Sequence, residues 1–199
     1  MNKILFIALL FLLSTTYAQN KGGHFNVSIS KIEGDLNKDG INDVVIVTQD
    51  TLNEILPYKL EVFFAQPNGK LKLIVSTIKA IEPASIGYGN EFDDVSIEKG
   101  VLIIDFQLLR GHYTHRFRYQ NGNFELIGYT EVGLSAGKVY TTDFNLSTGM
   151  RNEKVENIGT DKVLSNKIRK VLIRPLPKLQ DFVPATRIIV GHWKIKSNS

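Results

Sequence analysis

Apolar and polar residues alternate along several short stretches of this chain, with turn-forming residues between them. Residues 58–66 alternate, with the apolar set on one face, and residues 71–75 alternate again. The segment between them is Pro67-Asn68-Gly69. Two alternating runs joined by a few turn residues are typical of an antiparallel hairpin, so this region predicts one.

The same arrangement recurs over most of the chain. Further strands are expected at Phe25–Ile29, Val44–Val47, Val95–Ile97, Val101–Leu109, Tyr113–Gln120, Asn123–Thr130, Val139–Asn145 and Arg187–Ile195. Asp161–Ile173 fits either a helix capped by Thr160 or a strand, and its β-branched content favours the strand. Loops are expected at Asp50–Leu56 and Ala80–Phe92. The pattern predicts an all-β fold with antiparallel hairpins forming a sandwich, barrel or propeller-like sheet, and little helix beyond the N-terminal signal.

One hairpin has a predictable register. Asn121-Gly122 is a strong signal for a two-residue turn, which places Gln120 opposite Asn123. Tyr119 then faces Phe124, Arg118 faces Glu125, and Phe117 faces Leu126. The apolar pairs would share one face, and the prediction for the other face is an Arg118–Glu125 ion pair.

The first 18 residues have the pattern of an export signal. Lys3 precedes the apolar run Ile4–Leu13, and Thr16-Tyr17-Ala18 provides small residues before a cleavage site at Gln19. The apolar run is shorter than the roughly 20 residues needed to span a bilayer. The sequence therefore predicts a periplasmic or extracellular protein with no membrane span after cleavage. Residues 19–199 are expected to form a single β-rich domain, with 160–199 as a possible peripheral extension.

Composition and charge further restrict the kind of protein that this chain can be. The chain has no cysteine, which fits bacterial export without disulfides and requires another source of stability. Its formal net charge is +4, and basic residues are concentrated between Lys162 and Lys178. No aromatic side chains that could stack on bases lie among them, so a solvated basic face is favoured over nucleic-acid binding.

The segment Asp35–Asp43 carries the strongest chemical signal. Oxygen-bearing side chains occupy its first, third, fifth and ninth positions, and a glycine that permits a sharp turn occupies its sixth. Calcium takes six to eight oxygen ligands in a flexible shell, and alternate positions of a loop can supply them. The expected ligands are Asp35, Asn37, Asp39, the backbone carbonyl of Ile41, and Asp43. The alternative is a polar turn that binds no metal.

An EF-hand is excluded because its twelfth position requires a glutamate, and Ile46 stands there within an expected strand. The pattern Asp-x-Asn-x-Asp-Gly-x-x-Asp between two strands instead resembles the calcium loops of FG-GAP and VCBS-type repeats. Gly34 before the loop and Val44–Val47 after it extend the resemblance over about Ile32–Val47. The resemblance implies Ca²⁺ as the bound ion, and the sequence contains one copy.

The other residues that could form a metal, acid–base or sugar site are expected to have structural roles instead. His112 and His115 would point to opposite faces of a strand, which argues against a shared metal. Glu91, Asp93 and Asp94 form an acidic turn, and Asp105 in a buried strand needs a partner, for which Arg110, Arg116 and Arg118 are candidates. The aromatic set Tyr113, Phe117, Tyr119 and Phe124 is expected in the core rather than on a sugar-binding platform.

No catalytic motif is present in the sequence. The expected role is therefore a non-catalytic, calcium-stabilised β domain that binds an unknown protein or glycan outside the cytoplasm. The alternatives are a periplasmic or secreted hydrolase with an acidic site, and an inhibitor or immunity-type protein that occludes another protein's active site.

Overall fold

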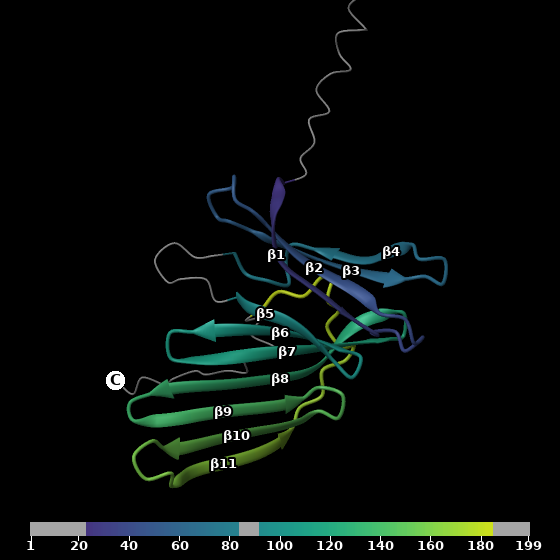
Figure 1. Ribbon diagram of the computed structural model, residues 1–199. Helices are drawn as coiled ribbons and strands as arrows, with labels where there is room; N and C mark the ends of the chain where they lie inside the picture. Colours follow the sequence, from purple (N-terminus) through teal and green to yellow (C-terminus); the bar gives the residue numbers. More distant parts are fainter. Residues whose placement is uncertain (1–22, 84–91, 185–199) are drawn as a thin grey trace, which may run out of the picture.

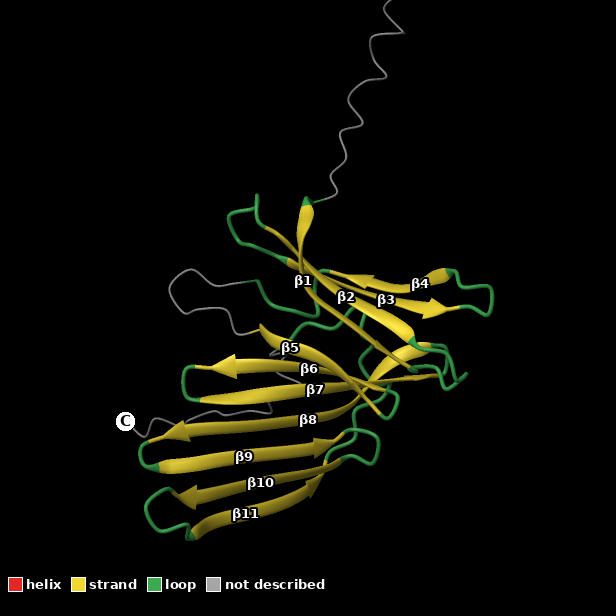
Figure 2. Cartoon of the chain, viewed as in Figure 1, coloured by secondary structure: helices red, strands yellow, loops and turns green. Residues whose placement is uncertain are grey.

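The computed structural model describes residues 23–83 and 92–184. In this part of the chain every regular element is a β-strand, and the strands form two antiparallel sheets in a sandwich-like arrangement (Figures 1 and 2). The all-β prediction is confirmed. The predicted export signal at 1–18, the strand with Trp193 and the residue Glu91 lie outside the described residues. No helix in the described ranges is long and apolar enough to cross a membrane.

The chain builds the two sheets almost entirely from sequential hairpins. The smaller sheet has the order β1-β2-β3-β4, with the bounds Phe25–Gly34, Asp43–Asp50, Tyr58–Ala65 and Leu71–Thr77. The larger sheet has the order β11-β10-β9-β8-β7-β6-β5. Its bounds, from β5 to β11, are Phe92–Glu98, Val101–Leu108, Gly111–Gln120, Asn123–Ser135, Lys138–Asn145, Met150–Asn157 and Val163–Lys170.

The core lies between the two sheets because each contributes one apolar face. Val45, Val47, Leu60 and Val62 come from the small sheet, and all are at most 1% exposed. The large sheet contributes buried side chains mainly from β6, β7 and β8, including Leu102, Ile104, Phe106, Phe117, Phe124 and Leu126. This is the alternation expected of facing antiparallel sheets.

Along one side the two sheets meet at their edge strands. Ser30 on β1 donates a hydrogen bond to the Asp94 carboxylate on β5, at 3.3 Å. Gly34 packs against Ile97, and a Cβ at Gly34 would lie 2.8 Å from Ile97 Cγ2. The start of the Asp35–Asp43 loop is therefore seated on the end of β5.

The β7–β8 hairpin has the predicted register. Tyr119 pairs with Phe124 and Phe117 with Leu126 on the core face, and Arg118 pairs with Glu125 on the other. The prediction of an Arg118–Glu125 ion pair was wrong, because the described structure forms no ion pair between these two side chains. Glu125 instead accepts a hydrogen bond from Gln120 Nε2 at 2.7 Å.

The segment from 160 onward contributes to both a sheet and the core. Asp161–Ile173 contains β11, so the strand interpretation is confirmed. Beyond it, backbone hydrogen bonds hold the chain beside the start of β8: Leu126 N–H donates to Pro177 O at 2.8 Å, and Leu179 N–H donates to Phe124 O at 2.9 Å. Leu179 and Phe182 then enter the core.

Candidate functional site

The predicted calcium loop is the connection between β1 and β2. It begins after Gly34 and ends where Asp43 starts β2. Lys38 and Gly40 both have left-handed backbone conformations, with φ of 66° and 85°. These two conformations turn the chain tightly enough to bring alternate side chains toward a common centre.

Asp35 accepts hydrogen bonds from the loop that follows it. Its Oδ1 accepts from the Lys38 amide at 2.6 Å and from the Asp39 amide at 3.2 Å. Its Oδ2 accepts from the Gly40 amide at 2.9 Å. The loop thus wraps around this one carboxylate, and the hydrogen bonds keep Asp35 next to the backbone of residues 38–40.

Asn37 and Asp39 lie next to each other inside the same turn. Asn37 Nδ2 donates to Asp39 Oδ2 at 2.9 Å, and Asn37 Oδ1 accepts from the Asp39 amide at 2.9 Å. Asp39 Oδ1 accepts from the Ile41 amide at 2.8 Å. Asp35, Asn37 and Asp39 are therefore brought together, and the Ile41 peptide follows directly after them.

Asp43 closes the loop as the first residue of β2 and is fully buried. Its Oδ2 accepts from the Leu36 amide at 2.9 Å, and its Oδ1 accepts from the Ala65 amide at 3.0 Å. Burial raises the pKa of the Asp43 carboxyl, and the hydrogen bonds from Leu36 and Ala65 oppose that rise. Asp43 thus links the loop to the end of β3.

The ligand atoms of the loop match what a calcium ion requires. The expected ligand atoms in residues 35–43 are all oxygens, the type that calcium prefers, and Asp35 and Asp39 are both accessible to solvent. Across the described residues, no three His, Cys, Asp or Glu side chains form a group ready to hold a metal. The donor chemistry fits, with amide and carbonyl oxygens needed beside the carboxylates.

The weaker candidates take structural positions. His112 is exposed and His115 fully buried, so the two point to opposite faces as predicted. Asp105 accepts a hydrogen bond from Thr114 Oγ1 at 2.5 Å. The expectation of an arginine partner was wrong, because Thr114 lies directly opposite Asp105 across β6 and β7. The four aromatic residues Tyr113, Phe117, Tyr119 and Phe124 belong to the core or pack against it.

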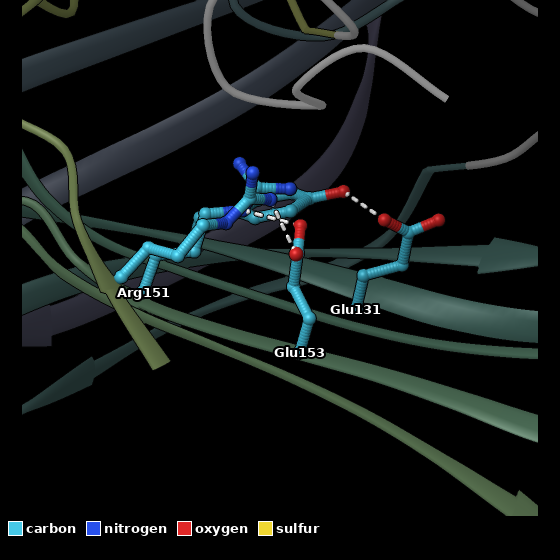
Figure 3. Close-up of polar contacts among 5 residues, drawn as sticks. Glu131, Arg151 and Glu153 are labelled. Atoms are coloured by element: carbon cyan, nitrogen blue, oxygen red, sulfur yellow. Dashed lines mark hydrogen bonds and ion pairs between the residues drawn. The ribbon is translucent and has the colours of Figure 1, made fainter. Parts of the chain in front are cut away.

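Sequence reasoning missed a polar cluster on the inner face of the large sheet. Glu131, Arg151 and Glu153 come from β8 and β10 and rise from the same face (Figure 3). Arg151 is 3% exposed, and its Nε contacts Glu153 Oε1 at 2.9 Å. Arg169 on β11 binds the other oxygen of Glu153. Alternation along β10 was the signal that could have placed Arg151 and Glu153 two residues apart on one face.

Tyr129 completes this cluster. Its hydroxyl donates to Glu131 Oε2 at 2.7 Å, and burial, together with the charge of Glu131, raises the pKa of the Tyr129 hydroxyl. Both carboxylates are already engaged, Glu131 by a hydroxyl and Glu153 by two guanidinium groups. These contacts tie β8, β10 and β11 together through their side chains.

Neither protein-family models, nor curated proteins, nor solved structures give a match to this chain.

Proposed function

We propose that this protein is an exported, non-catalytic β domain in which calcium, bound by the β1–β2 loop, stabilises a surface that binds another molecule. The observation that carries the proposal is the convergence of Asp35, Asn37 and Asp39 within one tight turn, with the side chains of Asn37 and Asp39 2.9 Å apart. Two carboxylates in so short a loop repel each other without a cation. A bound cation turns that repulsion into ligation.

Each expected ligand has a distinct part. Asp35, Asn37 and Asp39 would contribute side-chain oxygens, and Ile41 its backbone carbonyl. Asp43, whose oxygens accept two backbone hydrogen bonds, would mainly position the loop and could contribute a remaining lone pair. Calcium would supply charge neutralisation and a fixed loop geometry. The resemblance to FG-GAP and VCBS-type loops supports the same assignment.

A stabilising role is favoured over a reactive one by the position of the loop. Its first residue follows Gly34, which packs on Ile97 of the other sheet, and its last residue is tied to the end of β3. A rigid loop at this point would fix how β1 leads into β2 and how both sheets meet. An interaction module needs a rigid sheet and exposed connections, and this fold has both.

Thermal unfolding with calcium and with a chelator tests the proposal. If free calcium is about 100 times the dissociation constant, binding adds roughly 2.7 kcal/mol to the free energy of unfolding. At about 2–4 °C per kcal/mol, the melting temperature should fall by several degrees on chelation. Magnesium should restore little of the loss because it demands a tighter octahedral shell.

Two variants give the test a matched pair. Asp39→Ala should abolish the response to calcium. Asn42→Ala, which removes an exposed polar side chain from the same loop, should retain it. A wild-type melting temperature that does not move between chelator and millimolar calcium would show that the loop is only a turn.

A further inference from the structure

A second polar site lies at the turn end of the β7–β8 hairpin, on the face that points away from the core. A pocket of about 480 Å³ opens between the hairpin, the turn after β9 and the segment that follows β11. Its polar lining consists of Arg118, Gln120, Asn121, Glu125, Ser147 and Arg174, and Pro175 and Leu176 form an apolar wall. This volume lies within the range of about 300–1,000 Å³ typical of small-molecule sites.

Arg174 is held in place by the protein backbone. Its guanidinium donates to the carbonyl oxygens of Leu146, Ile173 and Ser147, at 3.0, 2.6 and 2.6 Å. A guanidinium has five N–H donors, so these three bonds leave two for another acceptor. The segment that carries Arg174 is itself fixed, because Pro177 and Leu179 hydrogen bond with β8. The cation is therefore positioned before any ligand arrives.

Arg118 brings a second positive charge into the same pocket. Within residues 23–83 and 92–184, no hydrogen bond or ion pair from its guanidinium is formed. Glu125, its neighbour across the hairpin, accepts from Gln120 instead. Two arginines and one glutamate line the pocket, which leaves a net charge of +1 on the lining. A half-buried guanidinium without a carboxylate partner is well suited to binding an oxyanion.

We infer that this pocket binds the carboxylate of an acidic sugar, a uronic acid either free or within a polysaccharide. The Arg118 and Arg174 guanidinium groups would take the carboxylate. The remaining polar groups are amides, a hydroxyl and a carboxylate, which match the donors and acceptors of sugar hydroxyls. Because Glu125 is part of the wall, a singly charged ligand is favoured over a doubly charged phosphate. This inference rests on the proposed binding role and names its ligand class.

NMR titration of the isotope-labelled, full-length mature protein tests the assignment. Galacturonate and glucuronate should shift resonances of the pocket residues, and galactose should not. An oligogalacturonate that binds more tightly than the monomer would identify a polysaccharide residue as the source, and equal affinity would identify the free sugar. Inorganic phosphate is the competing probe, and phosphate binding as tight as uronate binding would overturn the sugar assignment.

Three variants locate the binding. Arg118→Gln should weaken uronate binding by roughly tenfold to 100-fold, the effect expected for a lost charge-assisted hydrogen bond. Asn121→Asp should also weaken it, because the pocket then loses its net positive charge, and an Asp-Gly pair still suits the turn. Arg110→Gln removes an equal charge from an exposed position outside the pocket and should leave affinity unchanged.

The outcomes separate this inference from the proposed function. Should Arg118→Gln fail to fold, as judged by its melting temperature, Asn121→Asp still decides the matter. Uronate that causes no shifts in the wild-type protein at millimolar concentration, or binding that both variants leave intact, would overturn the pocket assignment. The calcium response of the melting temperature does not involve these residues, so it would stand or fall separately.

Discussion

Asp43 Oδ1 accepts a hydrogen bond from the Ala65 amide at 3.0 Å, which joins the first residue of β2 to the last residue of β3. The other oxygen of the same carboxylate accepts from the Leu36 amide in the loop. One buried side chain therefore satisfies two backbone donors, one in the loop and one on β3. Its structural role is separable from metal binding.

Replacement of Asp43 should destabilise the protein even without calcium. Asp43→Ala leaves the Leu36 and Ala65 amides without their acceptor, and each buried unsatisfied donor costs about 1–3 kcal/mol. In chelator we expect a loss of about 3 kcal/mol for Asp43→Ala and less than about 1 kcal/mol for Asp39→Ala, measured by urea unfolding. Equal losses in the two variants would contradict the separation of roles.

The Glu153 carboxylate should contribute strongly to stability because its partner Arg151 is buried. Glu153→Gln removes the charge that faces a guanidinium only 3% exposed, and breaking such a pair costs about 3 kcal/mol. Glu156→Gln is the matched control, because its Lys154 partner is 38% exposed and pairs of that kind contribute about 0–1 kcal/mol. Urea unfolding of both variants gives the comparison, and a similar small loss in each would show that Arg151 does not depend on Glu153.

Local sequence was sufficient wherever turn chemistry and alternation agreed. Asn121 and Gly122 both adopt positive φ, as the two-residue turn requires, and the pairing of Phe117–Gln120 follows from it. The hairpin around Asn68-Gly69 also follows from local sequence, although only Gly69 adopts a positive φ there. These elements depend on neighbours in the chain, so no knowledge of the tertiary structure was needed.

The missed features depend on packing or on weak local signals. β10, Met150–Asn157, is rich in polar and charged residues, so its alternation is a weak signal; the pairing of Arg151 with Phe144 of β9 is what places Arg151 on the inner face. The prediction for Asp105 failed because long arginines nearby in sequence were favoured over the small Thr114 opposite it. The candidate loop was found from its spacing alone, but the inward turn of Asp43 depends on β3, which lies beyond the motif.

Gly111 should be irreplaceable at the start of β7. Its φ is 145°, and a Cβ there would lie 2.0 Å from the Val132 carbonyl oxygen on β8. Gly137 also has a positive φ, of 72°, but a Cβ there would meet no atom within 4 Å. Gly137→Ala should cost about 1 kcal/mol from backbone strain, and Gly111→Ala more than about 3 kcal/mol because β7 and β8 must separate. Thermal unfolding distinguishes them, and equal costs would refute the close approach.

His115 should make the protein lose stability as the solution becomes acidic. The ring is fully buried among aromatic rings, with Phe182 at 4.7 Å and Tyr129 at 5.3 Å between centroids, and neither nitrogen has a hydrogen-bond partner within the described structure. Burial lowers the pKa of His115 from 6.5 to about 3. The folded state therefore favours the neutral imidazole.

The direction of the effect follows from proton binding. Below pH 6.5 the unfolded chain takes up a proton at this position that the folded chain rejects until about pH 3. The contribution of His115 to the free energy of unfolding is therefore complete above pH 6.5. It is lost as the pH falls from 6.5 toward 3, by up to about 1.4 kcal/mol per pH unit. His115→Phe keeps an aromatic ring in the cluster and removes the titration.

The measurement is the difference in unfolding free energy between His115→Phe and wild type, taken by urea unfolding at pH 7 and at pH 4. Carboxylates that titrate in this range are common to both proteins and cancel in the difference. We expect the variant to gain at least about 2 kcal/mol relative to wild type between the two pH values. His112→Gln, at an exposed position on the same strand, should follow wild type at both. A difference that does not change with pH would mean that His115 is protonated as readily in the folded protein as in the unfolded chain.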